Sequence, residues 1–190
     1  KSHRLKMMRV RVNLFYIKLK KLMKIIKSQT TNIDAIFELY EFATAFQQKV
    51  GTNTWKGFER KMVEQEIAEG RHFIIQDEDQ ISATFVLTYS DPIIWKEADS
   101  DPSVYIHRIA THPDFRGRNY VQKIVDWVIE FGKEKDLQFV RLDTTSGNEP
   151  LNQYYIKCGF TYKGISQIEW TADLPEHYKE GSFALFEIQI

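Results

Sequence analysis

Two arginines flank a glycine where an apolar run gives way to an amphipathic pattern, and this arrangement is suited to binding a phosphate. The β-prone run 104–110 stops at His112-Pro113, and Arg116-Gly117-Arg118 follows. Apolar residues then recur with helical spacing: Val121, Ile124, Val125, Val128 and Phe131. The first turn of a helix has backbone N–H groups without partners and a partial positive charge. Strand, basic turn and helix together therefore predict a phosphate or pyrophosphate site.

Groups that can move a proton lie elsewhere in the sequence. Tyr154, Tyr155 and Cys158 share one face of a predicted helix over 151–158. A phenol is neutral at pH 7 and can donate a proton, but both tyrosines could equally be core aromatics. A nucleophilic cysteine needs an activating base and an electropositive setting, and neither is indicated, so we expect Cys158 to be buried.

The strand 104–110 carries a histidine, and imidazole has a pKa suited to accepting a proton near neutral pH. A regular strand would place His107, Ile109 and Thr111 on one face, and Ile106, Arg108 and Ala110 on the other. His107 is thus a candidate base, although a packed structural histidine is the alternative. The remaining histidines show no spacing typical of a metal site, so no metal is predicted.

The elements needed to hold these residues can be read in order. A strand at 23–28 precedes a helix that a Thr31-Asn32-Ile33-Asp34 capping box opens and Gly51 ends. Further elements are expected as follows: a helix at 58–70, a hairpin of strands 72–76 and 80–89, a loop at 91–103, strand 104–110, the basic turn and its helix, strand 137–144, helix 151–158, and strands 160–170 and 182–190. This order predicts a mixed α/β sheet with helices on both faces.

Two motifs in this order resemble the GNAT N-acetyltransferase superfamily. Residues 116–121, RGRNYV, resemble its acetyl-CoA signature R/Q-x-x-G-x-G/A, with Asn119 and Val121 at the two small-residue positions. Residues 148–160, NEPLNQYYIKCGF, resemble its N-x-x-A-x-x-x-Y-x-x-x-G-F element, with Leu151 in place of the alanine. Two motifs in the expected order are more specific than either alone.

The resemblance implies a fold and a site. It implies a GNAT-like α/β domain over 23–190, with a central, mostly antiparallel, splayed sheet of about seven strands. It also implies that acetyl-CoA is bound, and that Tyr155 protonates its departing thiolate while His107 lies near the family's usual glutamate base. The cofactor-binding residues implied by position are Ile109, Ala110, Thr111, Arg116, Gly117, Arg118, Asn119, Tyr120, Val121 and Asn148.

The activity so implied is direct transfer of acetyl to a primary amine of a small molecule or peptide. The loops expected around the amine are 52–56 and 171–181, and the second carries Asp173, Glu176, His177, Tyr178 and Glu180. Acids and aromatics suit a cationic amine, but equally an ordinary solvated loop. Because Asn119 and Val121 depart from the signature, a non-catalytic acyl-CoA-binding module is the alternative.

Composition limits the remaining possibilities. The 190 residues, 43% of them hydrophobic, suit one packed domain, and no apolar stretch approaches the roughly 20 residues that cross a bilayer. One cysteine cannot form an internal disulfide, which favours a reducing, cytoplasmic location. Residues 1–22, read as a basic extension or a vector-derived remnant, could suggest a nucleic-acid-binding arm. All 26 acidic residues follow this segment, so neither nucleic acid nor membrane is expected as a partner, and a homodimer is possible.

Overall fold

The computed structural model describes residues 23–77, 79–172, 179 and 181–190. The expected basic extension at 1–22 lies outside these residues, as do the five polar residues 173, 176–178 and 180 expected near the amine. Among the described helices, none has the length and apolar composition needed to span a bilayer.

One seven-stranded sheet runs through the described residues in the order β1-β2-β3-β4-β5-β7-β6. Every neighbouring pair is antiparallel except β4 and β5, which are parallel. The sheet is therefore mostly antiparallel, as predicted. Its strands are β1 Lys24–Lys27, β2 His72–Asp77, β3 Gln80–Thr88, β4 Ser103–Thr111, β5 Phe139–Thr145, β6 Thr161–Gln167 and β7 Ser182–Gln189.

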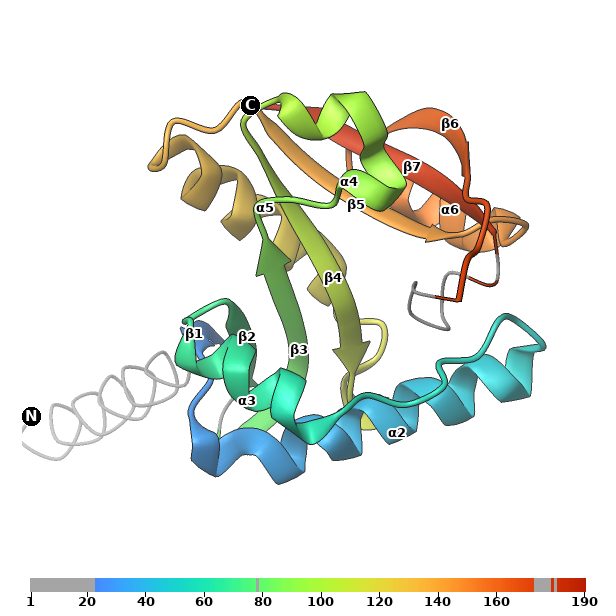
Figure 1. The fold of residues 1–190 in the computed structure, drawn as a ribbon. Coiled ribbons are helices and arrows are strands. Elements are labelled where there is room, and N and C mark those ends of the chain that lie inside the picture. Colours follow the sequence, from blue (N-terminus) through green and yellow to red (C-terminus); the bar gives the residue numbers. More distant parts are fainter. Residues whose placement is uncertain (1–22, 78, 173–178, 180) are drawn as a thin grey trace, which may run out of the picture.

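Helices cover both faces of this sheet (Figure 1). One face packs against α5 and α6 through a large apolar core, and the other packs against α2, α3 and α4 through two smaller clusters. The prediction of helices on both faces is confirmed. The helices are α2 Ile33–Val50, α3 Arg60–Ala68, α4 Pro92–Trp95, α5 Tyr120–Lys133 and α6 Glu149–Lys157.

Local sequence signals explain where the longest helix begins and ends. Gly51 takes a φ of 70° and caps α2 at its carboxyl end, as predicted, because glycine adopts left-handed angles without strain. The capping box lies two residues earlier than expected. The backbone N–H of Gln29 donates to Asn32 Oδ1 at 2.8 Å, so the cap closes the 3-10 turn Thr30–Asn32 that leads into α2.

A β-bulge interrupts the regular alternation that the sequence predicts for β4. His107 pairs with Val86 and Ala110 with Thr84, so two residues oppose Phe85, and Arg108 takes a φ of 51°. Ile109 consequently packs on the α5 side with Ile106, while Ala110 lies in the α2–α3 cluster. The prediction that His107 and Ile109 share a face is wrong, because the bulge shifts the pleat by one residue.

The parallel pair β4–β5 is short, and this creates the opening on which the site depends. Pairing joins 103–105 of β4 to 139–141 of β5 and ends at Tyr105 and Arg141. Beyond these residues the two strands diverge (Figure 1). Because side chains repeat every second residue, His107 and Asp143 are the first pair to face each other across the opening on the face that Tyr105 shares.

Candidate active site

The basic turn lies directly before α5, and aromatic side chains hold its two arginines. The Arg116 guanidinium lies 4.3 Å from the Phe46 ring centre and donates to the Phe42 carbonyl oxygen at 3.4 Å. The Arg118 guanidinium lies 4.6 Å from the Phe115 ring and donates to Asp77 Oδ2 at 3.3 Å. Both charges are thus held beside the helix start while they stay open to solvent.

The first turn of α5 is open to an anion. Asn119, its N-cap, has left-handed angles (φ 57°, ψ 39°), and no side chain caps the turn. Gly117 also has a positive φ of 78°, with open space where a side chain would project. Asn119 stands at a glycine position of the signature, and asparagine is among the few residues that tolerate this conformation. Val121 packs against the core, and Tyr120 is buried and donates to Asp77 Oδ2 at 2.5 Å.

The backbone angles at Asn119 lead to a stability prediction. Asn119→Val should lower the free energy of unfolding by about 1–2 kcal/mol, because a β-branched residue resists the left-handed region. Asn119→Gly should change it by less than about 0.5 kcal/mol. Urea denaturation of both variants measures the difference, and equal stability of the two would show that the site does not require a positive φ.

Residues from the second motif are placed by α6 and the strand pair that follows it. Asn148 caps the helix, since its Oδ1 accepts from the backbone N–H of Leu151 at 3.2 Å. Tyr155 packs against the core and lies 5.3 Å from the Phe186 ring, whereas Tyr154 is exposed. Burial, then the charge of Asp143, raises the pKa of Tyr155, so the phenol keeps its proton. Cys158 is buried, as expected.

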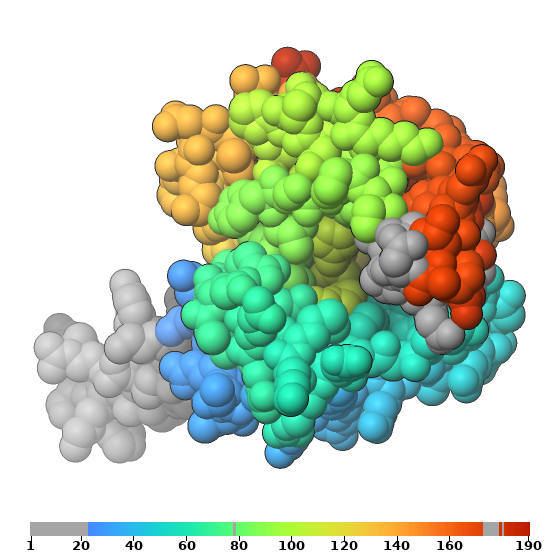
Figure 2. Space-filling model, viewed as in Figure 1, coloured from blue at the N-terminus to red at the C-terminus, as the bar shows by residue number. Residues whose placement is uncertain are grey.

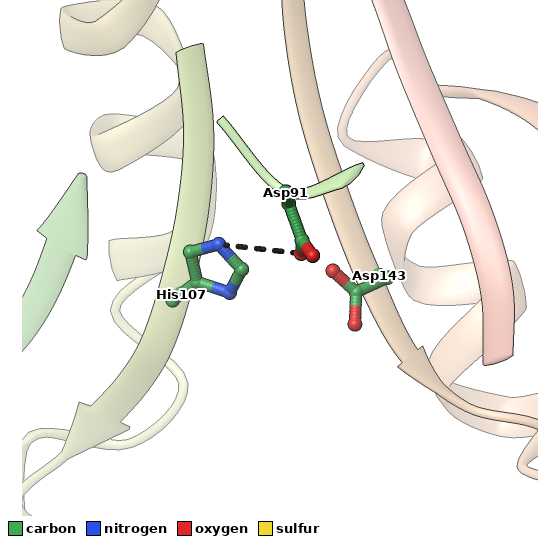
Figure 3. A group of neighbouring side chains, drawn as sticks. All are labelled: Asp91, His107 and Asp143. Atoms are coloured by element: carbon green, nitrogen blue, oxygen red, sulfur yellow. Dashed lines mark ion pairs between the residues drawn. The ribbon is translucent and has the colours of Figure 1, made fainter. Parts of the chain in front are cut away.

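A polar cluster lies where β4 and β5 diverge (Figure 3). His107 extends from β4, Asp143 from β5, and Asp91 from the end of the loop after β3; each offers a ligand atom within 4.8 Å of the others. His107 Nε2 lies 3.8 Å from Asp91 Oδ2 and 3.1 Å from Thr88 Oγ1. We call Asp91, His107 and Asp143 the acidic cluster.

The two carboxyl groups of the acidic cluster hold protons more tightly than usual. Burial raises the pKa of Asp143 to about 8, with a further contribution from the charge of Asp91. Burial likewise raises the pKa of Asp91 to about 6, although the Ile94 backbone N–H opposes the shift. Sequence reasoning found His107 but missed both acids. An aspartate inside the predicted strand 137–144 was a usable signal for Asp143, whereas nothing local marks Asp91.

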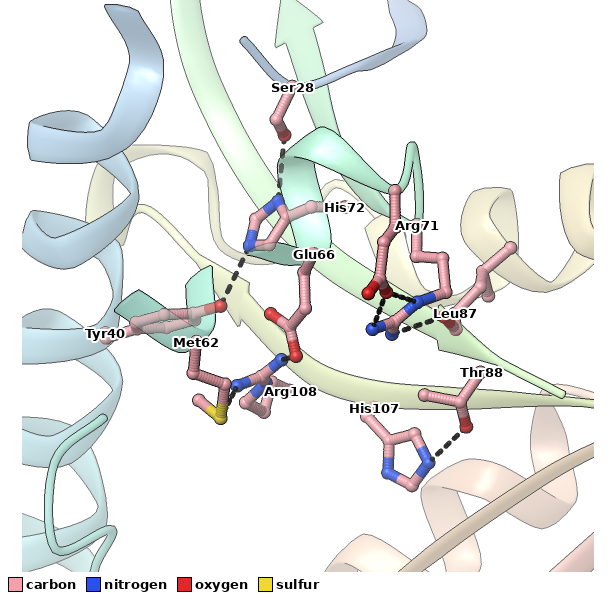
Figure 4. Close-up of polar contacts among 11 residues, drawn as sticks. Ser28, Tyr40, Met62, Glu66, Arg71, His72, Leu87, Thr88, His107 and Arg108 are labelled. Carbon is pink, nitrogen blue, oxygen red and sulfur yellow. Dashed lines mark hydrogen bonds and ion pairs between the residues drawn. The ribbon is translucent and has the colours of Figure 1, made fainter. Parts of the chain in front are cut away.

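A second polar network lies under α3 and is structural in character (Figure 4). Arg108, turned by the bulge, forms an ion pair with Glu66 and lies 5.0 Å from the Phe58 ring. His72 is held between Ser28 and Tyr40, at 2.8 and 3.0 Å, and burial lowers its pKa to about 3. This neutral histidine links β1, β2 and α2 and is not placed to exchange protons.

The expected loop between the first two helices packs beside this network. Trp55 lies 5.8 Å from the Tyr40 ring and 5.2 Å from Phe58, and these aromatics line a pocket of about 480 Å³ against α2. In the space-filling view, β4 is seen at the bottom of a recess on this face (Figure 2). The acidic cluster and Arg108 are thus approached from the side of the sheet that α2, α3 and α4 cover.

Of the residues implied for the cofactor, the structure gathers Arg116, Gly117, Arg118, Asn119, Tyr120 and Val121 at the start of α5, and Ile109, Ala110 and Thr111 follow the bulge in β4. Asn148 lies at the start of α6, where its side chain is engaged in capping. The two implied catalytic residues, Tyr155 on α6 and His107 on β4, are both related to Asp143. The charge of Asp143 contributes to the raised pKa of Tyr155, and its carboxylate offers an oxygen within 4.8 Å of a His107 ring nitrogen.

Comparison with known proteins gives one family and one fold. Residues 33–160 match the Acetyltransferase (GNAT) family. The uncharacterized N-acetyltransferase YesJ of Bacillus subtilis (strain 168) is 21% identical over 122 residues, which are 60% of this chain and 68% of that protein.

Solved structures share the architecture. Acetyltransferases of the GNAT family from Listeria monocytogenes and Streptococcus agalactiae each superpose with a TM-score of 0.71 at 21% identity, over 88% of this chain and 95% of theirs. The ribosomal-protein-S18-alanine N-acetyltransferase of Escherichia coli superposes with a TM-score of 0.61 at 15% identity, over 89% and 94%. The family match covers most of the described sheet and both motifs, and the chain is an acetyltransferase of the GNAT family.

Proposed function

We propose that this acetyltransferase moves acetyl from acetyl-CoA to a primary amine of a small molecule or peptide, in one direct step. The observation that carries the proposal is the opening between β4 and β5, which has the anion site of α5 at one end and Tyr155, Asp143 and His107 beside it. Acetyl-CoA has a pyrophosphate and a long arm that contains amides and ends in a thioester. It therefore needs an anion site and, beside it, a strand edge whose backbone groups can bond the arm.

The residues present suit acetyl-CoA. Arg116, Arg118 and the uncapped first turn of α5 supply positive charge and N–H donors for a pyrophosphate. Among the described strands, β4 pairs with β5 only as far as Tyr105, so backbone groups farther along β4 can bond the amides of a pantetheine arm and polarise a thioester carbonyl. Asn119 and Val121 are compatible with this role, because one adopts glycine-like angles and the other packs inward.

Catalysis then requires two proton movements by this chain's own residues. The acceptor amine must lose a proton before its nitrogen attacks the acetyl carbon. We assign this proton to His107, which lies beside Asp91 and Asp143 (Figure 3). A C–N bond forms, the C–S bond breaks, and Tyr155 gives its proton to the thiolate. The second proton leaves the amide nitrogen and restores the phenol of Tyr155 through solvent, while His107 releases the first proton to solvent, so the products are a neutral amide and a thiol. No covalent enzyme intermediate is needed.

Binding can be tested separately from turnover. Acetyl-CoA at a hundredfold excess over its dissociation constant should stabilise the protein by about 2.7 kcal/mol, seen as a higher melting temperature. Arg118→Gln should weaken acetyl-CoA binding about 10- to 100-fold, because a charged contact to phosphate is lost. Arg60→Gln is the control, since the ion pairs that Arg60 forms with Asp34 and Glu64 are exposed. Equal loss in both variants, or none in Arg118→Gln, would contradict this site.

Thiol release with a panel of amines tests the activity itself. Acetyl-CoA that stabilises the protein but is never consumed, whatever the amine, would identify a binding module instead of an enzyme. Consumption that depends on the amine supports the proposal, and the rate order across the panel gives the acceptor.

A further inference from the structure

One residue of β4 has a backbone conformation that its residue type disfavours. Arg108 takes a φ of 51°, and a left-handed φ is rare for a long side chain, because its Cβ approaches the following carbonyl oxygen. The residue lies in the bulge, where β4 carries one residue more than β3. A disfavoured backbone persists only where the surrounding contacts hold it.

Contacts from α3 and the loop before it hold the Arg108 side chain. The guanidinium forms an ion pair with Glu66, donates to Met62 Sδ at 3.5 Å and lies 5.0 Å from the Phe58 ring centre. Met62 and Glu66 are four residues apart on α3 and so share one face of the helix. Only 13% of the Arg108 side chain and 9% of the Glu66 side chain are exposed. Because a buried pair is screened less by water and salt, it couples α3 to the bulge more strongly than an exposed pair would.

Glu66 and Arg108 depend on each other. Among the described residues, the ion-pair partner of each is the other, and the second carboxylate oxygen of Glu66, Oε2, is buried without a hydrogen-bond partner. A buried charge that loses its partner is costly. The pair therefore fixes where the Arg108 side chain lies.

The left-handed φ decides on which face of the sheet Arg108 and the residues after it lie. Regular alternation would put Arg108 on the face of Ile106, in the large apolar core against α5. The bulge instead turns Arg108 toward α3 and puts Ile109 in that core (Figure 4). His107, just before the bulge, belongs to the acidic cluster, and the strand after the bulge is not paired with β5. The angles at Arg108 thus relate the candidate base to the backbone groups that would bond the thioester.

We propose that Glu66 is a positioning residue for acetyl transfer: through Arg108 it holds the bulge, and the bulge sets the relative positions of the His107 ring and the backbone of residues 109–110. This inference rests on the proposed function, because it assigns a further residue to the same reaction. The arginines of the anion site pack on other residues, so loss of Glu66 should lower kcat and leave the KM of acetyl-CoA nearly unchanged.

Glycine at position 108 provides the decisive comparison, because glycine adopts a left-handed φ without strain and alanine does so only at a cost. Glu66→Ala should lower kcat about 10- to 100-fold and change the KM of acetyl-CoA less than about threefold. Adding Arg108→Gly to Glu66→Ala should return kcat to within about fivefold of the wild type, whereas adding Arg108→Ala should leave it low. Both double variants lack the ion pair and its two charges, so they differ only in the residue at position 108.

Glu64→Ala is the matched control, since Glu64 lies on the same helix in an exposed pair with Arg60, and it should change neither constant. An undiminished kcat in Glu66→Ala, or equal kcat in the two double variants, would overturn the proposal. Melting temperatures show whether each variant is folded under assay conditions. If Glu66→Ala is not folded, the two double variants still decide, because neither leaves a buried charge without its partner.

The backbone can be measured apart from turnover. In the wild type, the three-bond coupling between the amide and α protons of Arg108 should have the smaller value of a left-handed residue, and in Glu66→Ala the larger value of an extended strand. This change in a protein that releases no thiol with any amine would remove the proposed function and keep Glu66 as the residue that holds the bulge. An unchanged coupling in folded Glu66→Ala, whatever its kcat, would overturn the proposal.

Discussion

Replacing Tyr155 by phenylalanine should lower kcat about 10²- to 10⁴-fold and leave acetyl-CoA affinity nearly unchanged. The phenol is held by packing against Phe160 and Phe186, so the ring of the variant should keep its place. Burial and the nearby Asp143 charge raise the pKa of Tyr155, which keeps the proton in place until a thiolate forms. Without this proton the sulfur must leave as an anion, which is the worse leaving group. Steady-state kinetics with saturating amine measure the loss.

Tyr154→Phe is the matched control for this result. Tyr154 precedes Tyr155 on α6, but it is exposed, and removal of its hydroxyl should change kcat less than threefold. An unchanged kcat in Tyr155→Phe would remove this residue from the mechanism. A parallel loss of acetyl-CoA affinity and melting temperature would show that the hydroxyl has a structural role instead.

Much of the fold could be predicted because its signals are local. The end of α2 follows from Gly51, and the start of α5 after the basic turn follows from the helical spacing of its apolar residues. Asn119 is instructive, since it stands at a glycine position of the signature and adopts left-handed angles that glycine also tolerates. At this position the backbone requires left-handed angles, and asparagine is one of the few residues besides glycine that adopt them.

The rest depends on contacts between distant residues. The bulge at Arg108 follows from the register of β4 against β3 and from the Glu66 ion pair, 42 residues away. For this reason the prediction from regular side-chain alternation put His107 and Ile109 on one face of β4, whereas they lie on opposite faces. Asp91 and Asp143 meet only because β4 and β5 diverge, and no spacing along the chain reveals which strands do so.

The position of Asp91 depends in turn on a buried arginine at the end of the β4–β5 pair. The Arg141 guanidinium bonds Asp101 and Glu187 at 2.8 Å and the Ala98 carbonyl oxygen at 2.5 Å. It also lies 4.7 Å from the Trp95 ring. Arg141 therefore fastens the segment 91–101 to the sheet, and this segment carries Asp91 to the opening.

Arg141→Met should lower the free energy of unfolding by about 3–5 kcal/mol, because removal of one partner leaves buried polar groups unpaired. Methionine keeps much of the side-chain length, so the loss should come mainly from the missing charge and hydrogen bonds. Glu187 retains Lys163 at 3.1 Å, which limits the penalty at that carboxylate. Urea denaturation followed by far-UV circular dichroism measures the change.

Arg60→Met is the control, since the Arg60 guanidinium forms exposed ion pairs with Asp34 and Glu64, and its removal should lower the free energy of unfolding by less than about 1 kcal/mol. The two variants remove the same charge, so the difference between their losses of unfolding free energy measures the effect of burial.

If the network also positions Asp91, Arg141→Met at a temperature where it remains folded should raise the KM of a protonated amine more than that of acetyl-CoA. A loss of stability below about 1 kcal/mol in Arg141→Met would show that solvent or a rearranged loop satisfies Asp101 and Glu187, and that the segment is held by its apolar contacts.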